Sequence, residues 1–112
     1  MRTLVAGLVV AFGVSLASAA LAQDKVAQGT KVYEAQKCSI CHSIEGKGNK
    51  KYPLDGVGSK LSEADVKEWI TDPRAAEKKH NATGKPPMKA YTNLPAADLD
   101  ALVAYLKSLS KK

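Results

Sequence analysis

Apolar residues recur at helical spacing near the C-terminal part of the chain, where the pattern is clearest. Between about Pro95 and Leu109 they return every three or four positions, as on the buried face of an amphipathic helix. The stripe consists of Leu99, Leu102, Val103, Leu106 and Leu109, with Tyr105 beside it. This pattern predicts a helix over the range.

A second helical pattern lies between Asp24 and about Gln36, with Val26, Gly29 and Tyr33 on one face. Asp24 is a suitable N-terminal capping residue for this helix. A glycine inside a helix costs about 1 kcal/mol relative to alanine. We therefore expect another helix to cross closely at Gly29.

Capping residues mark two further helix starts. Ser62 precedes Asp65 by three positions, a spacing close to that of the capping box. Asp72 is followed by Pro73, and proline is favoured at the first position of a helix. The second pair predicts a short helix that ends near Lys79.

The remaining segments lack regular patterns. Residues 45–60 contain four glycines, one proline and four lysines, and residues 81–94 contain the pair Pro86-Pro87, which excludes a regular helix there. No alternating run of β-branched or aromatic residues follows Ala22. The chain is thus predicted to be all-α, with about four or five helices and two long irregular segments. Such long loops in a small domain usually serve a function.

The first 22 residues have the pattern of a secretory signal peptide. Arg2 precedes 19 uncharged residues, which end in Ala20-Leu21-Ala22, a small-x-small cleavage site. We expect cleavage after Ala22, which would leave residues 23–112 as one domain in the periplasm. The alternative is an uncleaved anchor, because 19 helical residues span about 28 Å. The alanine-rich and serine-rich end of the stretch favours cleavage.

The two cysteines of the chain lie in the run Cys38-Ser39-Ile40-Cys41-His42. This C-x-x-C-H form is typical of covalent haem attachment. Both thiols can bond to one edge of a porphyrin, and the next residue, His42, can offer an imidazole nitrogen to iron. A dithiol or disulfide pair remains an alternative, as does a metal site completed by His80, although the ligand spacing suits zinc poorly.

With these residues in view, the chain resembles a class I c-type cytochrome of the small bacterial monohaem kind. Residues 29–33 are similar to the family's N-terminal helix, whose glycine meets an aromatic residue of the last helix, here Tyr105. Residues 53–58 resemble the loop whose proline carbonyl, here that of Pro53, accepts the proximal histidine's proton. The resemblance implies a cytochrome c-like fold around one haem c, held by thioethers at Cys38 and Cys41.

The resemblance also places Met88 as the second axial ligand, opposite His42. Met88 is the sole methionine after Ala22, and it follows Pro86-Pro87. His80 is the rival ligand, but its neighbours Lys78, Lys79 and Asn81 indicate a solvated helix end. We expect Pro53, Leu54 and Trp69 to line the haem pocket, where Trp69 can also donate to a haem propionate.

The positive charge of the chain indicates which kind of partner it binds. The chain has 17 Lys and Arg against 11 Asp and Glu, and many of the lysines lie in the two irregular segments. If both segments border the haem, they form a positive surface suited to acidic redox partners such as reductase and oxidase complexes. Nucleic acid is disfavoured, since the basic residues have little aromatic interleaving. The lysines in question are Lys47, Lys50, Lys51, Lys60, Lys78, Lys79, Lys85 and Lys89.

The function predicted from these residues is single-electron transfer between periplasmic or membrane redox complexes, by a monomer that is not an enzyme and is not embedded in the membrane once cleaved. Two alternatives remain open at this point. One is a haem subunit of a larger oxidoreductase. The other is an open-site haem sensor or peroxidase-like protein, in which Met88 is not bound.

Overall fold

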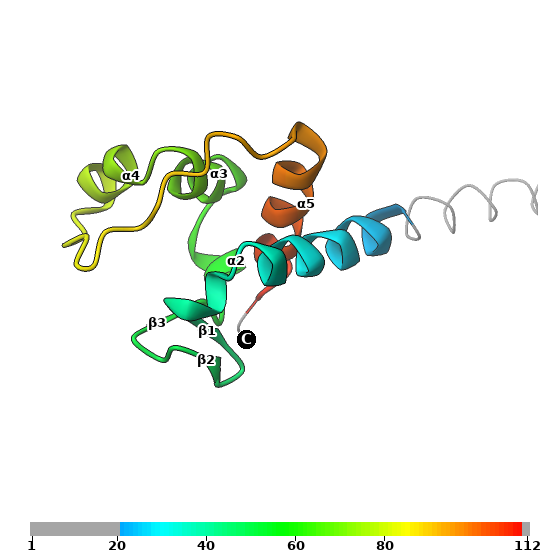
Figure 1. Ribbon diagram of the computed structural model, residues 1–112, viewed down its shortest axis with the longest axis horizontal. Helices are drawn as coiled ribbons and strands as arrows, with labels where there is room; N and C mark the ends of the chain where they lie inside the picture. Colours follow the sequence, from blue (N-terminus) through cyan, green and yellow to red (C-terminus); the bar gives the residue numbers. More distant parts are fainter. Residues whose placement is uncertain (1–20, 111–112) are drawn as a thin grey trace, which may run out of the picture.

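The computed structural model describes residues 21–110, which are mostly helical (Figure 1). An N-terminal helix occupies the described positions 21–35. It is followed by a 3-10 helix, η1 (Cys38–Ile40), by strands β1 (His42–Ile44), β2 (Lys47–Gly48) and β3 (Tyr52–Pro53), and by helices α2 (Val57–Lys60), α3 (Glu63–Thr71), α4 (Pro73–His80) and α5 (Ala96–Lys107). The predicted cleavage segment lies almost wholly outside the described residues.

The core joins three helices that are distant in sequence. Val32 and Tyr33 come from the N-terminal helix, Val66 and Ile70 from α3, and the rest from α5, namely Leu102, Val103 and Leu106. All seven side chains are at least 92% buried. The predicted apolar stripe near the C-terminus therefore faces the core, on a helix that ends two residues earlier than expected.

The N-terminal helix crosses α5 at Gly29, as the position of this glycine inside a helix predicted. A Cβ atom at Gly29 would lie 2.6 Å from the Cβ atom of Tyr105 and against the carbonyl group of Ala101. Tyr105 also packs edge-on against Tyr33, with ring centroids 5.8 Å apart. The missing side chain at Gly29 thus allows the two backbones to approach closely.

The predicted cap at Asp24 is wrong, because the helix is already formed at residue 21. The helix continues on the N-terminal side of Asp24, because the residues there, Leu21, Ala22 and Gln23, all have good helix propensity. The other two caps are confirmed. The Ser62 hydroxyl accepts from the amide of Asp65 at 3.1 Å, and the Asp72 carboxylate accepts from the amide of Ala75 at 3.3 Å. Pro73 occupies the first turn of α4.

A small sheet that the sequence pattern did not predict lies between η1 and α2. Its order is β2-β1-β3, with β1 antiparallel to β2 and parallel to β3. Strands of two or three residues are too short to show an alternating pattern. The parallel pairing sets His42 opposite Tyr52, which determines the geometry described below.

The segment between α4 and α5 contains no helix or strand, as the two prolines predicted. In Figure 1 it runs from the end of α4 back past α3 to the start of α5. The amide of Tyr91 donates to the carbonyl of Ile70 in α3 at 2.8 Å. Among the described residues, no helix is both long enough and apolar enough to span a membrane.

Candidate functional site

A cavity of about 630 Å³ lies between the small sheet, α3, α4, α5 and the segment 81–94. Its volume falls in the range of small-molecule and cofactor sites. Much of its wall is apolar and comes from core side chains, including Val66, Ile70, Leu102 and Leu106. Every site residue predicted from the sequence also lines it: Cys38, Cys41, His42, Pro53, Leu54, Trp69 and Met88.

The two cysteines lie on η1 and directly after it, at one edge of the cavity. Lys37 adopts a left-handed conformation with φ of 57°, and the amide of Cys41 donates to the carbonyl of Cys38 at 3.2 Å. Both thiols are free. Cys38 is half-buried and Cys41 is exposed, and burial raises the pKa of the Cys38 thiol to about 11. The tight turn thus presents both cysteine sulfur atoms to one cavity.

His42 lies on β1, and its imidazole is fixed by a main-chain acceptor. Nδ1 lies 2.9 Å from the carbonyl oxygen of Tyr52, an arrangement in which Nδ1–H donates and Nε2 keeps its lone pair. Burial lowers the pKa of the His42 imidazole, so the neutral form is favoured. A neutral imidazole with one oriented nitrogen is the form that binds metals.

The expected acceptor for His42 was the carbonyl of Pro53, and the structure places that role one residue earlier, at Tyr52. The reason is the register of the sheet. Parallel pairing of β1 with β3 sets His42 beside Tyr52 and Ser43 beside Pro53. The carbonyl of Ser43 in turn accepts from the amide of Leu54 at 2.8 Å. Pro53 and Leu54 still line the cavity.

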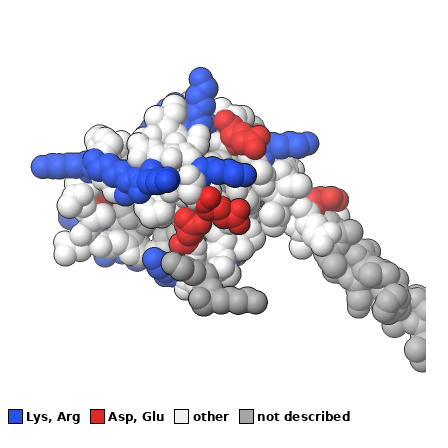
Figure 2. All heavy atoms as spheres, turned by 90° about the horizontal axis from the view of Figure 1, so that it is seen from below, with Lys and Arg blue, Asp and Glu red and all other residues white. Residues whose placement is uncertain are grey.

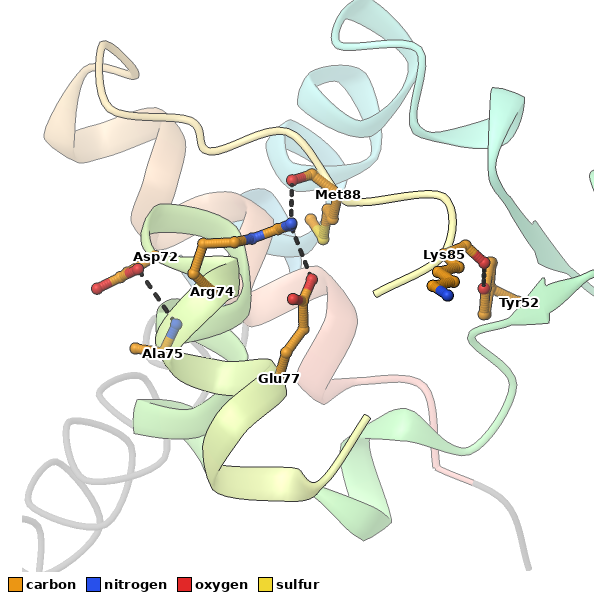
Figure 3. A network of polar contacts seen from close by, with 7 residues as sticks. All are labelled: Tyr52, Asp72, Arg74, Ala75, Glu77, Lys85 and Met88. Carbon is orange, nitrogen blue, oxygen red and sulfur yellow. Dashed lines mark hydrogen bonds and ion pairs between the residues drawn. The ribbon is translucent and has the colours of Figure 1, made fainter. Parts of the chain in front are cut away.

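Met88 reaches the cavity from the segment 81–94, and α4 holds its main chain. Arg74 donates from Nη2 to the carbonyl oxygen of Met88 at 2.8 Å and pairs with the carboxylate of Glu77 at 2.7 Å. Figure 3 shows this chain of contacts from α4 to the methionine. The carboxylate orients the guanidinium, and the guanidinium fixes the backbone at Met88.

A second contact holds the same segment at Lys85, three residues before Met88. The Tyr52 hydroxyl donates to the carbonyl of Lys85, as Figure 3 also shows. Pro86 and Pro87 lie between this contact and the one at Met88. Since proline fixes its own φ angle, the short stretch has little freedom between its two attachments.

His80, the rival to Met88, also lines the cavity but is occupied elsewhere. Its ring stacks on Trp69, with centroids 5.9 Å apart and an interplanar angle of 21°. Its Nε2 lies 3.8 Å from the carboxylate of Asp65, which Lys79 also contacts at 2.6 Å. These contacts hold His80 at the end of α4, beside Trp69, which is half-buried in the cavity wall.

The donors around the cavity fit a haem attached through two cysteines. Two thiols, an imidazole with one oriented nitrogen, and a thioether share one largely apolar wall, which is the donor set of a His/Met-ligated c-type haem. Tyr33 gives an independent indication. Its hydroxyl is buried in the cavity wall without a hydrogen-bond partner among the described residues, and burial raises its pKa to about 12.

Sequence reasoning missed Tyr52, Arg74 and Glu77. Two of them act on main-chain carbonyls, and such contacts leave no spacing pattern in a sequence. The pair Arg74 and Glu77 does have the i, i+3 spacing of a helical ion pair, which was a usable signal. Tyr52 lies next to the predicted Pro53 and could have been found only through the strand register.

Most of the chain matches a known protein family. The family model described as "Cytochrome c" matches residues 26–110. The chain is 32% identical over 91 residues to cytochrome c oxidase subunit 2 of Alkalihalophilus pseudofirmus, in a match that covers 73% of this chain. The match spans only 25% of that relative's length. No solved structure matches.

Proposed function

The chain belongs to the cytochrome c family, and we propose that it is a monohaem electron carrier whose single haem c is held by thioether bonds to Cys38 and Cys41. When bound, haem c supplies an iron that alternates between Fe(II) and Fe(III), so that one electron passes without a change in any substrate bond. The task of the protein is to hold, orient and shield that group.

His42 and Met88 are the axial ligands in this proposal. The observation that carries it is that one cavity receives both side chains, with Nδ1 of His42 already engaged by Tyr52. The main chain of Met88 is held by Arg74, whereas His80 is stacked on Trp69. Histidine–methionine ligation in a cavity with apolar walls favours the reduced state and raises the potential.

A visible spectrum of the purified holoprotein tests this function. We expect a six-coordinate low-spin spectrum, with the weak red band of methionine–iron ligation in the oxidised form. Pigment should remain with the polypeptide through denaturing electrophoresis and acidic acetone, and Cys38→Ala combined with Cys41→Ala should release it. A high-spin spectrum would instead favour the open-site sensor or peroxidase-like alternative.

We propose export to the periplasm, with residues 1–22 removed as a signal peptide. Intact-mass measurement of the native protein decides this, since the expected mature chain begins at Gln23. A native protein that begins at Met1 and fractionates with membranes would contradict cleavage.

The partners that we propose are acidic redox proteins. Four lysines line the cavity, Lys37, Lys51, Lys60 and Lys89, against two acidic residues, Asp55 and Glu77. Glu77 is already paired with Arg74. Figure 2 shows Lys and Arg side chains projecting from the molecular surface, with acidic groups between them. Electron transfer to an acidic partner should slow as ionic strength rises.

A second candidate function is supported by the similarity to an oxidase subunit. In that case the chain would act as a haem subunit of a larger oxidoreductase. Gel filtration and affinity purification from the native membrane fraction distinguish the two. A free carrier runs as a monomer, whereas a subunit copurifies with its complex in fixed ratio.

A further inference from the structure

Tyr52 contacts both sides of the cavity with two different groups. Its main-chain carbonyl accepts from Nδ1 of His42 at 2.9 Å, and its hydroxyl donates to the carbonyl of Lys85. His42 and Lys85 are separated by 43 positions in the chain. One residue on β3 therefore connects the strand that carries His42 to the segment that carries Met88.

The segment from Lys85 to Met88 is short and stiff. Its first residue is held by Tyr52 and its last by Arg74, with Pro86 and Pro87 between them. Because the prolines restrict rotation inside the stretch, release of either end lets Met88 move as part of the segment. The hydroxyl of Tyr52 thus acts on Met88 from the side opposite α4.

The tyrosine itself is well placed for this role. Tyr52 is half-buried in the cavity wall, and its ring lies 6.3 Å from the His42 ring, measured between centroids. The Nζ atom of the preceding residue, Lys51, lies over the Tyr52 ring, 5.7 Å from its centroid. These contacts limit the positions that the phenol can take and so define where its hydroxyl meets the segment.

We propose that Tyr52 is a positioning residue for the iron site, in which the hydroxyl holds the Met88 segment in place relative to the His42 side through the Lys85 carbonyl. This inference deepens the proposed function and rests on its assignment of Met88 as an axial ligand. Tyr52 does not bind the iron. It connects the stiff segment that carries Met88 to the strand that carries His42.

The test is Tyr52→Phe in the haem-loaded protein, because this variant removes the hydroxyl and keeps the carbonyl that faces His42. The measurement is the dissociation constant of added imidazole for the oxidised protein, followed by visible absorption, since imidazole must displace Met88 to bind. Loss of one hydrogen bond that holds the segment should tighten imidazole binding about fivefold. Tyr105→Phe is the matched control, since Tyr105 packs at the Gly29 crossing and does not line the cavity.

Tyr105→Phe should leave imidazole binding within about twofold of the unchanged protein. The double variant Tyr52→Phe with Arg74→Gln should show a combined effect that differs from the sum of the two single effects, because both contacts act on one stiff segment. An unchanged imidazole affinity in Tyr52→Phe would overturn the proposal, and so would equal tightening in Tyr52→Phe and Tyr105→Phe.

The assignment of Met88 is tested separately by the unsubstituted protein. If its oxidised spectrum lacks the methionine–iron band, the proposed ligation itself is wrong and the role of Tyr52 falls with it. If the band is present and only the Tyr52→Phe result fails, the electron-carrier assignment stands and the positioning role is rejected.

Discussion

Arg74 and Met88, fourteen positions apart, are joined by a 2.8 Å hydrogen bond from the guanidinium to the methionine carbonyl. The contact ties the position of Met88 to α4, a helix whose start is fixed by Asp72 and Pro73. The N-cap of α4, which the sequence predicts, therefore determines where Arg74 lies. Through that arginine it also affects the position of Met88 in the cavity wall.

Arg74→Gln should loosen the Met88 segment without unfolding α4. Its side chain is 53% exposed, so we expect the lost contact to weaken the segment by only about 1 kcal/mol. In a urea titration of the oxidised protein, the methionine–iron band should disappear at a lower urea concentration than the helical circular dichroism signal. Lys78→Gln removes an exposed charge from the same helix and should leave the two transitions as they are in the unsubstituted protein.

Met88→His should keep the iron low-spin and lower its reduction potential by roughly 100 mV or more, because thioether sulfur stabilises Fe(II) relative to imidazole. Met88→Ala should open the site to carbon monoxide. Redox titration and carbon monoxide binding measure the two effects. His80→Ala is the control, since that ring is stacked on Trp69. A high-spin spectrum from His80→Ala, with Met88→Ala unaltered, would reverse the ligand assignment.

Gly29→Ala should destabilise the protein by about 1–3 kcal/mol, the usual cost of forcing extra atoms into a packed crossing. The added Cβ would meet the Ala101 carbonyl group and the Tyr105 Cβ atom, and both belong to the helix that carries the cavity walls Leu102 and Leu106. Urea unfolding of the haem-loaded protein gives the free energy. Lys31→Ala, at an exposed position of the same helix, should change it by less than about 0.5 kcal/mol.

The contact between Asp65 and Lys79 makes stability depend on pH at both extremes. The hydrogen bond from Lys79 lowers the pKa of Asp65, and the same bond raises the pKa of Lys79. The carboxylate contribution is present above the ordinary Asp pKa of about 3.9 and is lost as pH falls through the lower folded value. The ammonium contribution is present below the ordinary Lys pKa of about 10.4 and is lost as pH rises through the higher folded value.

Asp65→Asn should therefore be less stable than the unsubstituted protein between about pH 4 and pH 10. The difference should shrink at more acidic and at more alkaline pH. Thermal unfolding midpoints measured across this range test the prediction, and Lys79→Gln should show the same window. A difference that persists unchanged at pH 2 would mean that the ion pair is not its cause.

The sequence predicted those parts of the fold that depend on local signals. Ser62 and Asp72 form their caps with residues three positions away, so a short window of sequence contains both partners. The stripe on α5 is visible for the same reason. Gly29 predicted the helix crossing because a glycine inside a helix lowers the stability of that helix, and the close approach of a second helix explains its presence.

The parts that were missed depend on contacts with the main chain of distant residues. The acceptor for His42 is Tyr52 and not Pro53, because a parallel strand pairing of two residues sets the register. Arg74 and Tyr52 both donate to carbonyl groups, which every residue has. Side-chain chemistry in a sequence shows that Cys38, Cys41 and His42 belong to one motif, but it does not show which backbone atoms orient them.

The crossing of Gly29 with Ala101 and Tyr105 also bears on how fast the molecule can fold. The contact joins positions more than 70 residues apart, and Gln28 donates to Asp98, 70 positions away in the chain. Chains whose native contacts are far apart in sequence fold slowly, because the intervening loop must close before those contacts form. We therefore expect the cavity wall supplied by α5 to form late in folding, and the Cys38 thiol, which is half-buried in the folded chain, to remain accessible until that wall docks.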